Sequence, residues 1–295
     1  MGMGGNGMNE RQGVRPVRKW QLRTRELEFG VRPCVMGILN VTPDSFSDGG
    51  TFFTVDSAVD RALRMEDAGA GILDIGGEST RPYSQGVEED EELGRVVPVL
   101  ERLVGRVSIP ISIDTTKAKV ARAAIALGAE ILNDVSGLEA DEEMVAVARE
   151  TGVGVCAMHR QGTPQTMQEN PTYEHCVIEI LEYLWERDRT LISAGISPDR
   201  ICLDPGIGFG KLHEHNLQLV RSAEIFHQLG RPILVGHSRK GFIGKVLGSK
   251  DIPRDAGTLG VSFALARRGI QVLRVHDVAM HVQAFRLLES VESDC

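Results

Sequence analysis

Short apolar segments alternate with amphipathic ones along most of the chain. From about residue 34, a β-branched run ends abruptly in polar residues, and a longer segment with apolar residues every three or four positions follows. Eight such runs occur, at residues 34–42, 71–77, 111–116, 130–137, 153–159, 201–206, 232–238 and 272–277. Between them, segments such as 57–70, 116–129 and 173–195 predict helices that end beside a glycine suited to a left-handed cap.

This alternation predicts an α/β fold with a parallel sheet. We expect a single-domain (β/α)8 TIM barrel over residues 34–295, because composition does not shift along the chain. An open doubly wound sheet would give the same alternation, and the strand count alone does not separate the two folds. Residues 14–33 predict an N-terminal hairpin that caps the barrel bottom, with a basic surface for a partner as the alternative. The Gly-rich residues 1–13 are expected to be disordered.

Charge and composition narrow the range of partners. The chain has 295 residues and a formal net charge of −8, which repels polyanions over long range. Its aromatic content of 5% argues against a stacking platform for single-stranded nucleic acid. We therefore expect no nucleic acid and no membrane, but small-molecule substrates whose phosphates are bound by a few placed cations.

The sequence also favours a cytoplasmic location. The N-terminal residues contain no apolar segment typical of a signal peptide, and no stretch approaches the length of a membrane span. The cysteines lack CxxC spacing, and three of them lie in apolar runs, so we expect buried free thiols. They are Cys34, Cys156, Cys176, Cys202 and Cys295.

Polar residues end every apolar run, and in a barrel of this kind the strand ends carry the active site. Each residue alone has a structural explanation, such as a helix cap at Asp114 or a turn at Asn133. An apolar barrel, however, has no structural need for so many polar groups around one rim. The set comprises Asn40, Thr42, Asp44, Thr80, Arg81, Asp114, Asn133, Asp204, Ser238, Arg239, Lys240, Arg274 and His276.

Two kinds of chemistry are combined in this set. Asp114, Asn133 and Asp204 offer acceptors and an amide, which suit a heterocycle with adjacent ring N–H, amino and carbonyl groups, such as a pterin. Cationic groups and a hard oxygen ligand, which suit a diphosphate and its Mg²⁺, come from Arg81, Arg274, His276 and Asn40. The sequence therefore predicts a ligand with two different ends.

Three further segments have competing interpretations. The string GIGFGK at 206–211 does not form a phosphate-binding loop, because Leu212 stands where such a loop needs Ser or Thr. A zinc site at His213 and His215 is not expected, since side chains two apart on a helix diverge. Residues 42–54, rich in Gly, Ser and Asp, predict a lid that closes over ligands, with a merely flexible connector as the alternative.

The strand-end strings together resemble those of the dihydropteroate synthase family. They cover the barrel from about residue 34 to about residue 290 and stand in the family's order. They are MGILNVTPDSFSDGG (36–50), DIGGESTRP (74–82), SIDT (112–115), NDVSG (133–137), MHRQGTPQTMQ (158–168), LDPGIGFGK (203–211), GHSRKGFIG (236–244) and RVHD (274–277).

The resemblance implies a reaction and a role for each matching residue. The reaction joins p-aminobenzoate to 6-hydroxymethyl-7,8-dihydropterin pyrophosphate, releases pyrophosphate and uses Mg²⁺ but no covalent protein nucleophile. Pterin binding is implied for Asp114, Asn133, Asp204, Lys240 and Met158, and a catalytic role for Asp44, Asp114, Asp204 and Lys240. Diphosphate binding is implied for Asn40, Thr80, Arg81, Arg274 and His276, with Asn40 also the metal ligand. Aminobenzoate binding is implied for Thr42, Pro43, Phe46, Pro82, Ser238 and Arg239. The family also implies a homodimer.

Two alternatives and one departure accompany this interpretation. A pterin-binding methyltransferase barrel would share the pterin pocket but lack the diphosphate residues, and NVTPDSF, STRP, SRK and RVHD are all present. A catalytically inactive pterin-binding paralogue would be expected to have lost the lid or Lys240. After STRP, this chain has Tyr83 where many relatives carry small residues, which places bulk near the expected aminobenzoate entrance.

Overall fold

A closed barrel of parallel strands forms the centre of the protein. The computed structural model describes residues 16–30, 32–42, 54–249 and 251–292. Its barrel strands are β3 (Cys34–Asn40), β4 (Ile72–Gly76), β5 (Ile111–Asp114), β6 (Ile131–Asp134), β7 (Gly154–Met158), β8 (Ile201–Asp204), β9 (Leu234–Val235) and β10 (Val272–Val275). Their order is β8-β7-β6-β5-β4-β3-β10-β9. A bridge between Leu203 and Ile233 joins β8 to the β9 side, and the Leu203 N–H donates to the Pro232 carbonyl at 3.0 Å. The barrel prediction is therefore confirmed over the open sheet.

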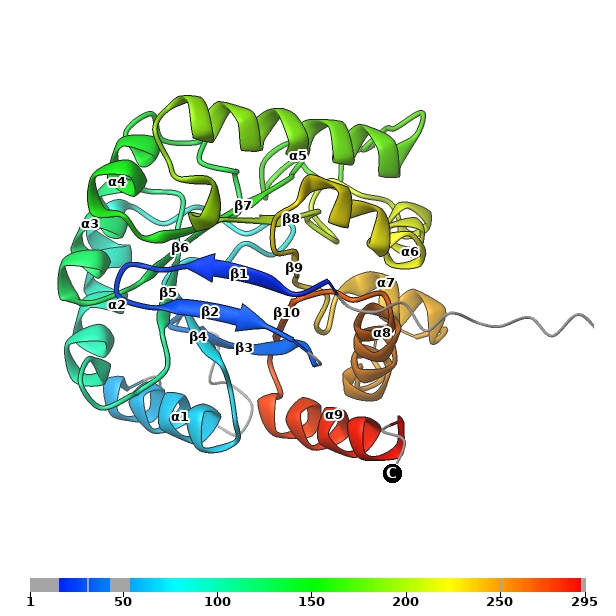
Figure 1. Cartoon of the computed structure of the whole chain (residues 1–295), viewed down its shortest axis with the longest axis horizontal. Helices are drawn as coiled ribbons and strands as arrows, with labels where there is room; N and C mark the ends of the chain where they lie inside the picture. The colour runs from blue at the N-terminus through cyan, green and yellow to red at the C-terminus, as the bar shows by residue number, and fades with distance from the viewer. Residues whose placement is uncertain (1–15, 31, 43–53, 250, 293–295) are drawn as a thin grey trace, which may run out of the picture.

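Helices surround this barrel (Figure 1). They are α1 (Val55–Asp67), α2 (Glu89–Leu103), α3 (Ala118–Leu127), α4 (Met144–Thr151), α5 (Cys176–Ser193), α6 (His213–Arg221), α7 (Gly241–Val246), α8 (Asp255–Arg267) and α9 (Val278–Glu292), with 3-10 segments η2 (Pro198–Arg200) and η3 (Ala223–Leu229). Local sequence explains the ends: Thr54 caps α1 by accepting from the Ser57 N–H at 3.1 Å. Gly128 follows α3 with φ 125°, a conformation that residues with a Cβ rarely adopt.

Side chains alternate between the outer and inner faces of each barrel strand, and they form two separate apolar cores. On β4, Leu73 and Ile75 point outward into the main apolar core between the barrel and the helices. Ile72 points inward and belongs to a second apolar cluster at the lower end of the barrel, with Met36 and Cys156. Above this lower cluster, most inward positions are polar or small, with Ile38 and Met158 as apolar exceptions. The mainly apolar filling therefore gives way to a group of buried polar side chains at the carboxyl ends of the strands, here called the polar chamber.

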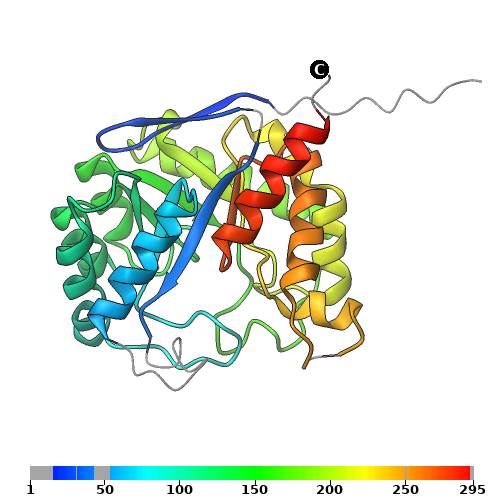
Figure 2. The same cartoon turned by 90° about the horizontal axis from the view of Figure 1, so that it is seen from below.

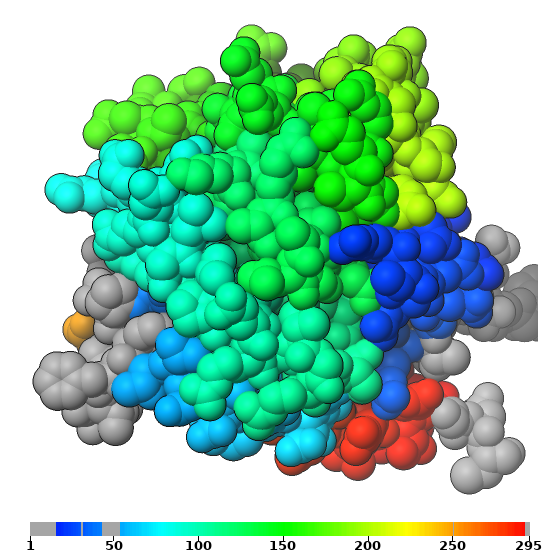
Figure 3. All heavy atoms as spheres, turned by 90° about the vertical axis from the view of Figure 1, so that its left-hand side faces the viewer, coloured from blue at the N-terminus to red at the C-terminus, as the bar shows by residue number. Residues whose placement is uncertain are grey.

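The N-terminal hairpin covers the lower end. Its strands β1 (Arg18–Gln21) and β2 (Glu26–Phe29) pair antiparallel. Trp20 has no exposed surface, packs into the lower apolar cluster and donates from Nε1 to the Arg200 carbonyl at 2.8 Å. Figures 2 and 3 show the hairpin lying across one end of the molecule. The predicted hairpin is confirmed, and its apolar face explains why it lies against the barrel.

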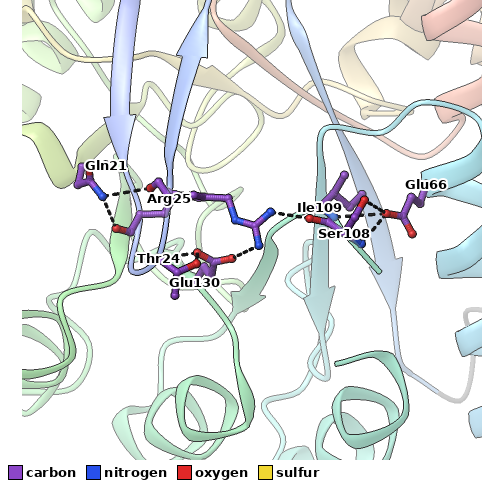
Figure 4. A network of polar contacts seen from close by, with 8 residues as sticks. Gln21, Thr24, Arg25, Glu66, Ser108, Ile109 and Glu130 are labelled. Carbon is purple, nitrogen blue, oxygen red and sulfur yellow. Dashed lines mark hydrogen bonds and ion pairs between the residues drawn. The ribbon is translucent and has the colours of Figure 1, made fainter. Parts of the chain in front are cut away.

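Polar contacts fasten the tip of this hairpin (Figure 4). The buried Glu130 carboxylate accepts from the Thr24 N–H at 3.1 Å and the Thr24 hydroxyl at 2.6 Å. Arg25 forms an ion pair with Glu130 at 2.9 Å and donates to the Ser108 carbonyl. Ser108 in turn donates from its N–H to Glu66 at 2.7 Å. These contacts close the lower end, so ligands have access from the opposite rim.

Two further predictions concern membrane-spanning helices and the N-terminal segment. No helix within the described ranges is long and apolar enough to cross a membrane. The segment 1–13, expected to be disordered, lies outside the described residues.

Candidate active site

The carboxyl ends of the strands bring the predicted pterin-binding residues together. Asp114 ends β5 and is the register partner of Asn133 on β6, while Met158 on β7 is the partner of Asp204 on β8. The side chains of Asp114, Asn133 and Asp204 point inward, and these residues are 9%, 4% and 5% exposed. Adjacent strands thus present two carboxylates and an amide in one chamber.

Arg274 occupies the middle of this chamber. Its Nε donates to Asp74 Oδ2 at 2.5 Å, and its Nη2 donates to Asp114 Oδ2 at 2.6 Å. Burial raises the pKa of Asp114 to about 7, although Arg274 opposes that change. Burial would lower the pKa of Arg274, but Asp74 and Asp114 outweigh it and raise that pKa. A residue predicted for the diphosphate therefore contacts a residue predicted for the pterin.

Lys240 and Phe209 form the neighbouring wall. The Lys240 ammonium donates to the Ile207 carbonyl and lies 4.4 Å from the centroid of the Phe209 ring. Burial lowers the pKa of Lys240 to about 7, opposed by Asp204. The Asp204 carboxylate accepts from the Gly206 N–H at 2.7 Å, and burial raises its pKa. Phe209 was not anticipated from the sequence, where a lone aromatic residue is indistinguishable from core.

Lys211 supports this wall from behind. It is 2% exposed and donates to the Phe209 carbonyl at 2.9 Å, while its Nζ lies 2.9 Å from His159 Nδ1. Burial lowers the pKa of Lys211 to about 7 and that of His159 to about 2. The lysine of the GIGFGK string therefore holds two loops together, which agrees with the interpretation that this string is not a phosphate loop.

The predicted diphosphate residues lie higher on the rim. His276 Nδ1 is 2.9 Å from the Ser238 hydroxyl, which also accepts from the His276 N–H at 3.3 Å. Burial first, and then Arg274, Arg239, Arg61 and Arg81, lower the pKa of His276 to about 3. This environment disfavours the charged imidazolium form of His276. Arg61, on α1, was missed by the sequence analysis.

The remaining predicted site residues either lie around this rim or fall outside the residues that the structure describes. Asn40 ends β3, Thr42 is buried, Thr80 is half-buried, and Arg81 and Pro82 are exposed in the loop after β4. Tyr83 is 66% exposed with φ 65°, and its N–H donates to the Pro164 carbonyl at 2.9 Å. Pro43, Asp44 and Phe46, with the rest of the predicted lid between Thr42 and Thr54, lie outside the described residues.

Arg239 has a left-handed backbone that α8 holds in place. Its φ is 58°, its N–H donates to the Thr258 hydroxyl at 3.0 Å, and its carbonyl accepts from Arg254 at 2.9 Å. The guanidinium Nε contacts Asp255 at 2.7 Å. The first turn of α8 therefore fixes both the backbone and the side chain of this rim residue.

The donor set limits the kind of metal site. Among the residues that the structure describes, no group of three or more His, Cys, Asp or Glu side chains could hold a metal ion. Mg²⁺, however, keeps several waters and is often bound through substrate phosphates with only one or two protein oxygens. The Asn40 amide oxygen at the rim fits that limited role.

A parallel barrel with buried polar side chains at the carboxyl ends of its strands, covered at the other end by a hairpin, is the architecture of enzymes whose active site lies at that rim. Residues 36–276 match the family of pterin binding enzymes. The chain belongs to this family.

Similar proteins within the family include dihydropteroate synthases. The Escherichia coli K12 enzyme is 46% identical over 261 residues, which cover 88% of this chain and 92% of that relative. The Xanthomonas albilineans enzyme solved with 4-aminobenzoic acid has a TM-score of 0.87 and 42% identity, covering 95% of this chain and 100% of that one. Its complex with 7,8-dihydropteroate gives 0.83 and 41%, with coverage of 94% and 100%. The family resemblance inferred from the strand-end motifs is confirmed.

Proposed function

We propose that this chain is a dihydropteroate synthase, a transferase that joins p-aminobenzoate to 6-hydroxymethyl-7,8-dihydropterin pyrophosphate and yields 7,8-dihydropteroate and pyrophosphate. The observation that carries the proposal is the chamber in which Asp114, Asn133 and Asp204 converge beside Arg274. The ligands of the Xanthomonas albilineans complexes are one substrate and the product of this reaction, which supports it.

The chamber suits a reaction in which the leaving group departs ahead of the attacking amine. A dihydropterin ring delocalises the positive charge left on the carbon that carried the diphosphate, and the carboxylates of Asp114 and Asp204 stabilise that charge. Arg274 and Arg81 bind the departing diphosphate, and Ser238 orients the His276 ring beside it. Met158 and Lys240 complete the pterin pocket. No covalent protein nucleophile is needed.

Mg²⁺ is part of the proposal, held by Asn40 together with oxygens of the diphosphate. When bound, it would supply charge stabilisation to the leaving group. The aminobenzoate is proposed to bind at the rim near Thr42, Pro82, Ser238 and Arg239, where the exposed guanidinium of Arg239 offers a partner for its carboxylate.

A homodimer is proposed through a surface at the start of α6, the end of α7 and the segment that leads to α8. Leu212, Val246, Leu247 and Ile252 are exposed there by 43%, 60%, 43% and 39%. Single exposed apolar residues are ordinary, but several on adjoining elements indicate a contact surface. Replacing Leu247 with Glu should shift the protein toward monomer in analytical ultracentrifugation, and an unchanged sedimentation coefficient would contradict this surface.

A cytoplasmic location is proposed from the cysteines. Cys34, Cys156, Cys176 and Cys202 are free thiols, and all but the half-buried Cys34 are buried. Free thiols are typical of a reducing compartment.

The function is tested by pyrophosphate release from purified protein given hydroxymethyldihydropterin pyrophosphate and Mg²⁺, with and without p-aminobenzoate. We expect release that depends on the amine, with dihydropteroate formed in equal amount. Pterin binding without amine-dependent release would contradict the proposal and favour a catalytically inactive pterin-binding protein.

A further inference from the structure

One buried carboxylate, Asp74, contacts both halves of the candidate site. It lies on β4, has no exposed surface, and points into the barrel between its register partners Ile38 and Ser112. Its Oδ2 accepts from Arg274 Nε at 2.5 Å. Both of its oxygens lie 3.3 Å from Asn133 Nδ2. The sequence analysis assigned Asp74 no role.

The contact with Asn133 fixes the polarity of an amide. Beside a guanidinium, the Asp74 carboxylate accepts hydrogen bonds and does not donate them. The Asn133 side chain must therefore turn its NH₂ group toward Asp74, because the reverse orientation would face oxygen with oxygen. This leaves Oδ1 as the atom that Asn133 offers to a ligand, so the ligand must present an N–H donor there.

The contact with Arg274 fixes the plane of a guanidinium. The guanidinium is a rigid fork, so anchoring Nε on Asp74 while Nη2 contacts Asp114 sets its orientation in the chamber. Gly76 and Gly236 leave space around these side chains: a Cβ at Gly76 would lie 3.4 Å from the Asp114 Cβ, and one at Gly236 would lie 3.8 Å from Arg274 atoms. Without Asp74, only the Asp114 contact would hold this long side chain, and the ligand would have to fix its orientation.

We propose that Asp74 is a positioning residue that presets the Asn133 amide for the pterin and the Arg274 guanidinium for the diphosphate. The inference rests on the proposed function, because it takes the pterin and the diphosphate as the ligands of these two residues. Asp74 touches neither ligand and acts only through its two partners.

The test measures the two halves separately by calorimetry on the full chain, with 6-hydroxymethylpterin and inorganic pyrophosphate plus Mg²⁺ as probes. Asp74→Asn is isosteric but removes the negative charge and leaves one acceptor oxygen for two donors. We expect each affinity to fall by about 10- to 100-fold, the usual effect of removing a group that orients a ligand-binding side chain. Ser112→Ala is the matched control, since the buried Ser112 hydroxyl has no hydrogen-bond partner among the described residues. It should leave both affinities unchanged.

A double exchange separates positioning from a merely structural role. Asn133→Asp alone places two carboxylates side by side and should weaken pterin binding. Adding Asp74→Asn restores a donor opposite an acceptor with the polarity reversed, while residue 133 still offers an oxygen to the ligand. Pterin affinity should then recover by about 10-fold relative to Asn133→Asp, a rescue that a purely structural carboxylate would not give.

Several outcomes would overturn the inference. They are Asp74→Asn affinities within about twofold of wild type, an equal loss in Ser112→Ala, or no recovery in the double exchange. If Asp74→Asn does not fold, Asp74→Glu decides, because it keeps the charge but displaces it by one methylene; two unchanged affinities would again overturn the inference. These assays need no turnover, so a wild type that binds both probes without amine-dependent release contradicts the proposed function alone.

Discussion

Replacing Asp114 with Asn should change how stability depends on pH. Burial raises the pKa of Asp114 from the ordinary 3.8 to about 7, so between these values the folded protein holds a proton that the unfolded chain has lost. Stability from this group is therefore complete below pH 3.8 and is lost as pH rises through about 7. The amide introduced by Asp114→Asn is isosteric, cannot titrate and still offers an oxygen to Arg274, so the variant lacks this loss.

The expected magnitude follows from the width of that window. Each pH unit inside it changes the free energy of unfolding by about 1.4 kcal/mol for one proton. Between about pH 5 and about pH 8, wild type should lose up to about 3 kcal/mol relative to Asp114→Asn. Urea unfolding of both proteins across this range gives the difference, and Asp199→Asn, at an exposed position near the barrel bottom, controls for the loss of a carboxylate.

A second measurement connects the same proton to the ligand. If the pterin donates hydrogen bonds to an ionised Asp114, pterin affinity in wild type should rise with pH through about 7 and then level off. The Asp114→Asn variant should bind more weakly, without this rise. Parallel stability curves for the two proteins, or a wild-type affinity independent of pH, would refute the assignment of this proton to Asp114.

Three further perturbations test other parts of the structure. Glu130→Ala removes the acceptor of both Thr24 donors and should lower the free energy of unfolding by about 2 kcal/mol in urea titrations, leaving kcat unchanged; a reduced kcat at full folding would contradict a purely structural latch. Gly206→Ala should be far more destabilising than Gly230→Ala, since both have positive φ but only at Gly206 would a Cβ meet a backbone oxygen, at 1.9 Å; equal effects in thermal melts would exclude that clash. His276→Ala should keep 6-hydroxymethylpterin affinity but reduce turnover by about 10²-fold in the pyrophosphate assay, and full activity would remove His276 from the diphosphate site.

The barrel could be predicted because its strands are recognisable one at a time. Each strand is a short apolar run with its own polar end, and no long-range information is needed to find it. The run at 232–238 nevertheless gives a strand of only two residues, Leu234–Val235. Pro232 has no N–H to donate, and beyond the strand His237 and Ser238 make side-chain contacts with Ser262 and His276.

Some residues of the candidate site could be found from the sequence, and others could not. Asp114 and Asp204 end their strands and were found for that reason, whereas Asp74 stands inside an apolar run with Ile75 and Gly76 after it. The sequence did indicate the position of Asp74, because alternation along the run places its side chain on the inward face of the strand with Ile72. The lowered pKa of His276 could not be foreseen, because it depends on burial and on arginines from separate segments that only the fold brings together.

The hairpin that covers the lower end of the barrel also sets a condition on synthesis. Trp20 is made early, but the Arg200 carbonyl that it contacts lies 180 residues later in the chain. At typical elongation rates of about 5–20 residues per second, the hairpin waits roughly 10 to 40 s before this partner exists. During that interval the indole lacks this partner, so the hairpin can complete its contacts with the barrel only after most of the barrel has been synthesised.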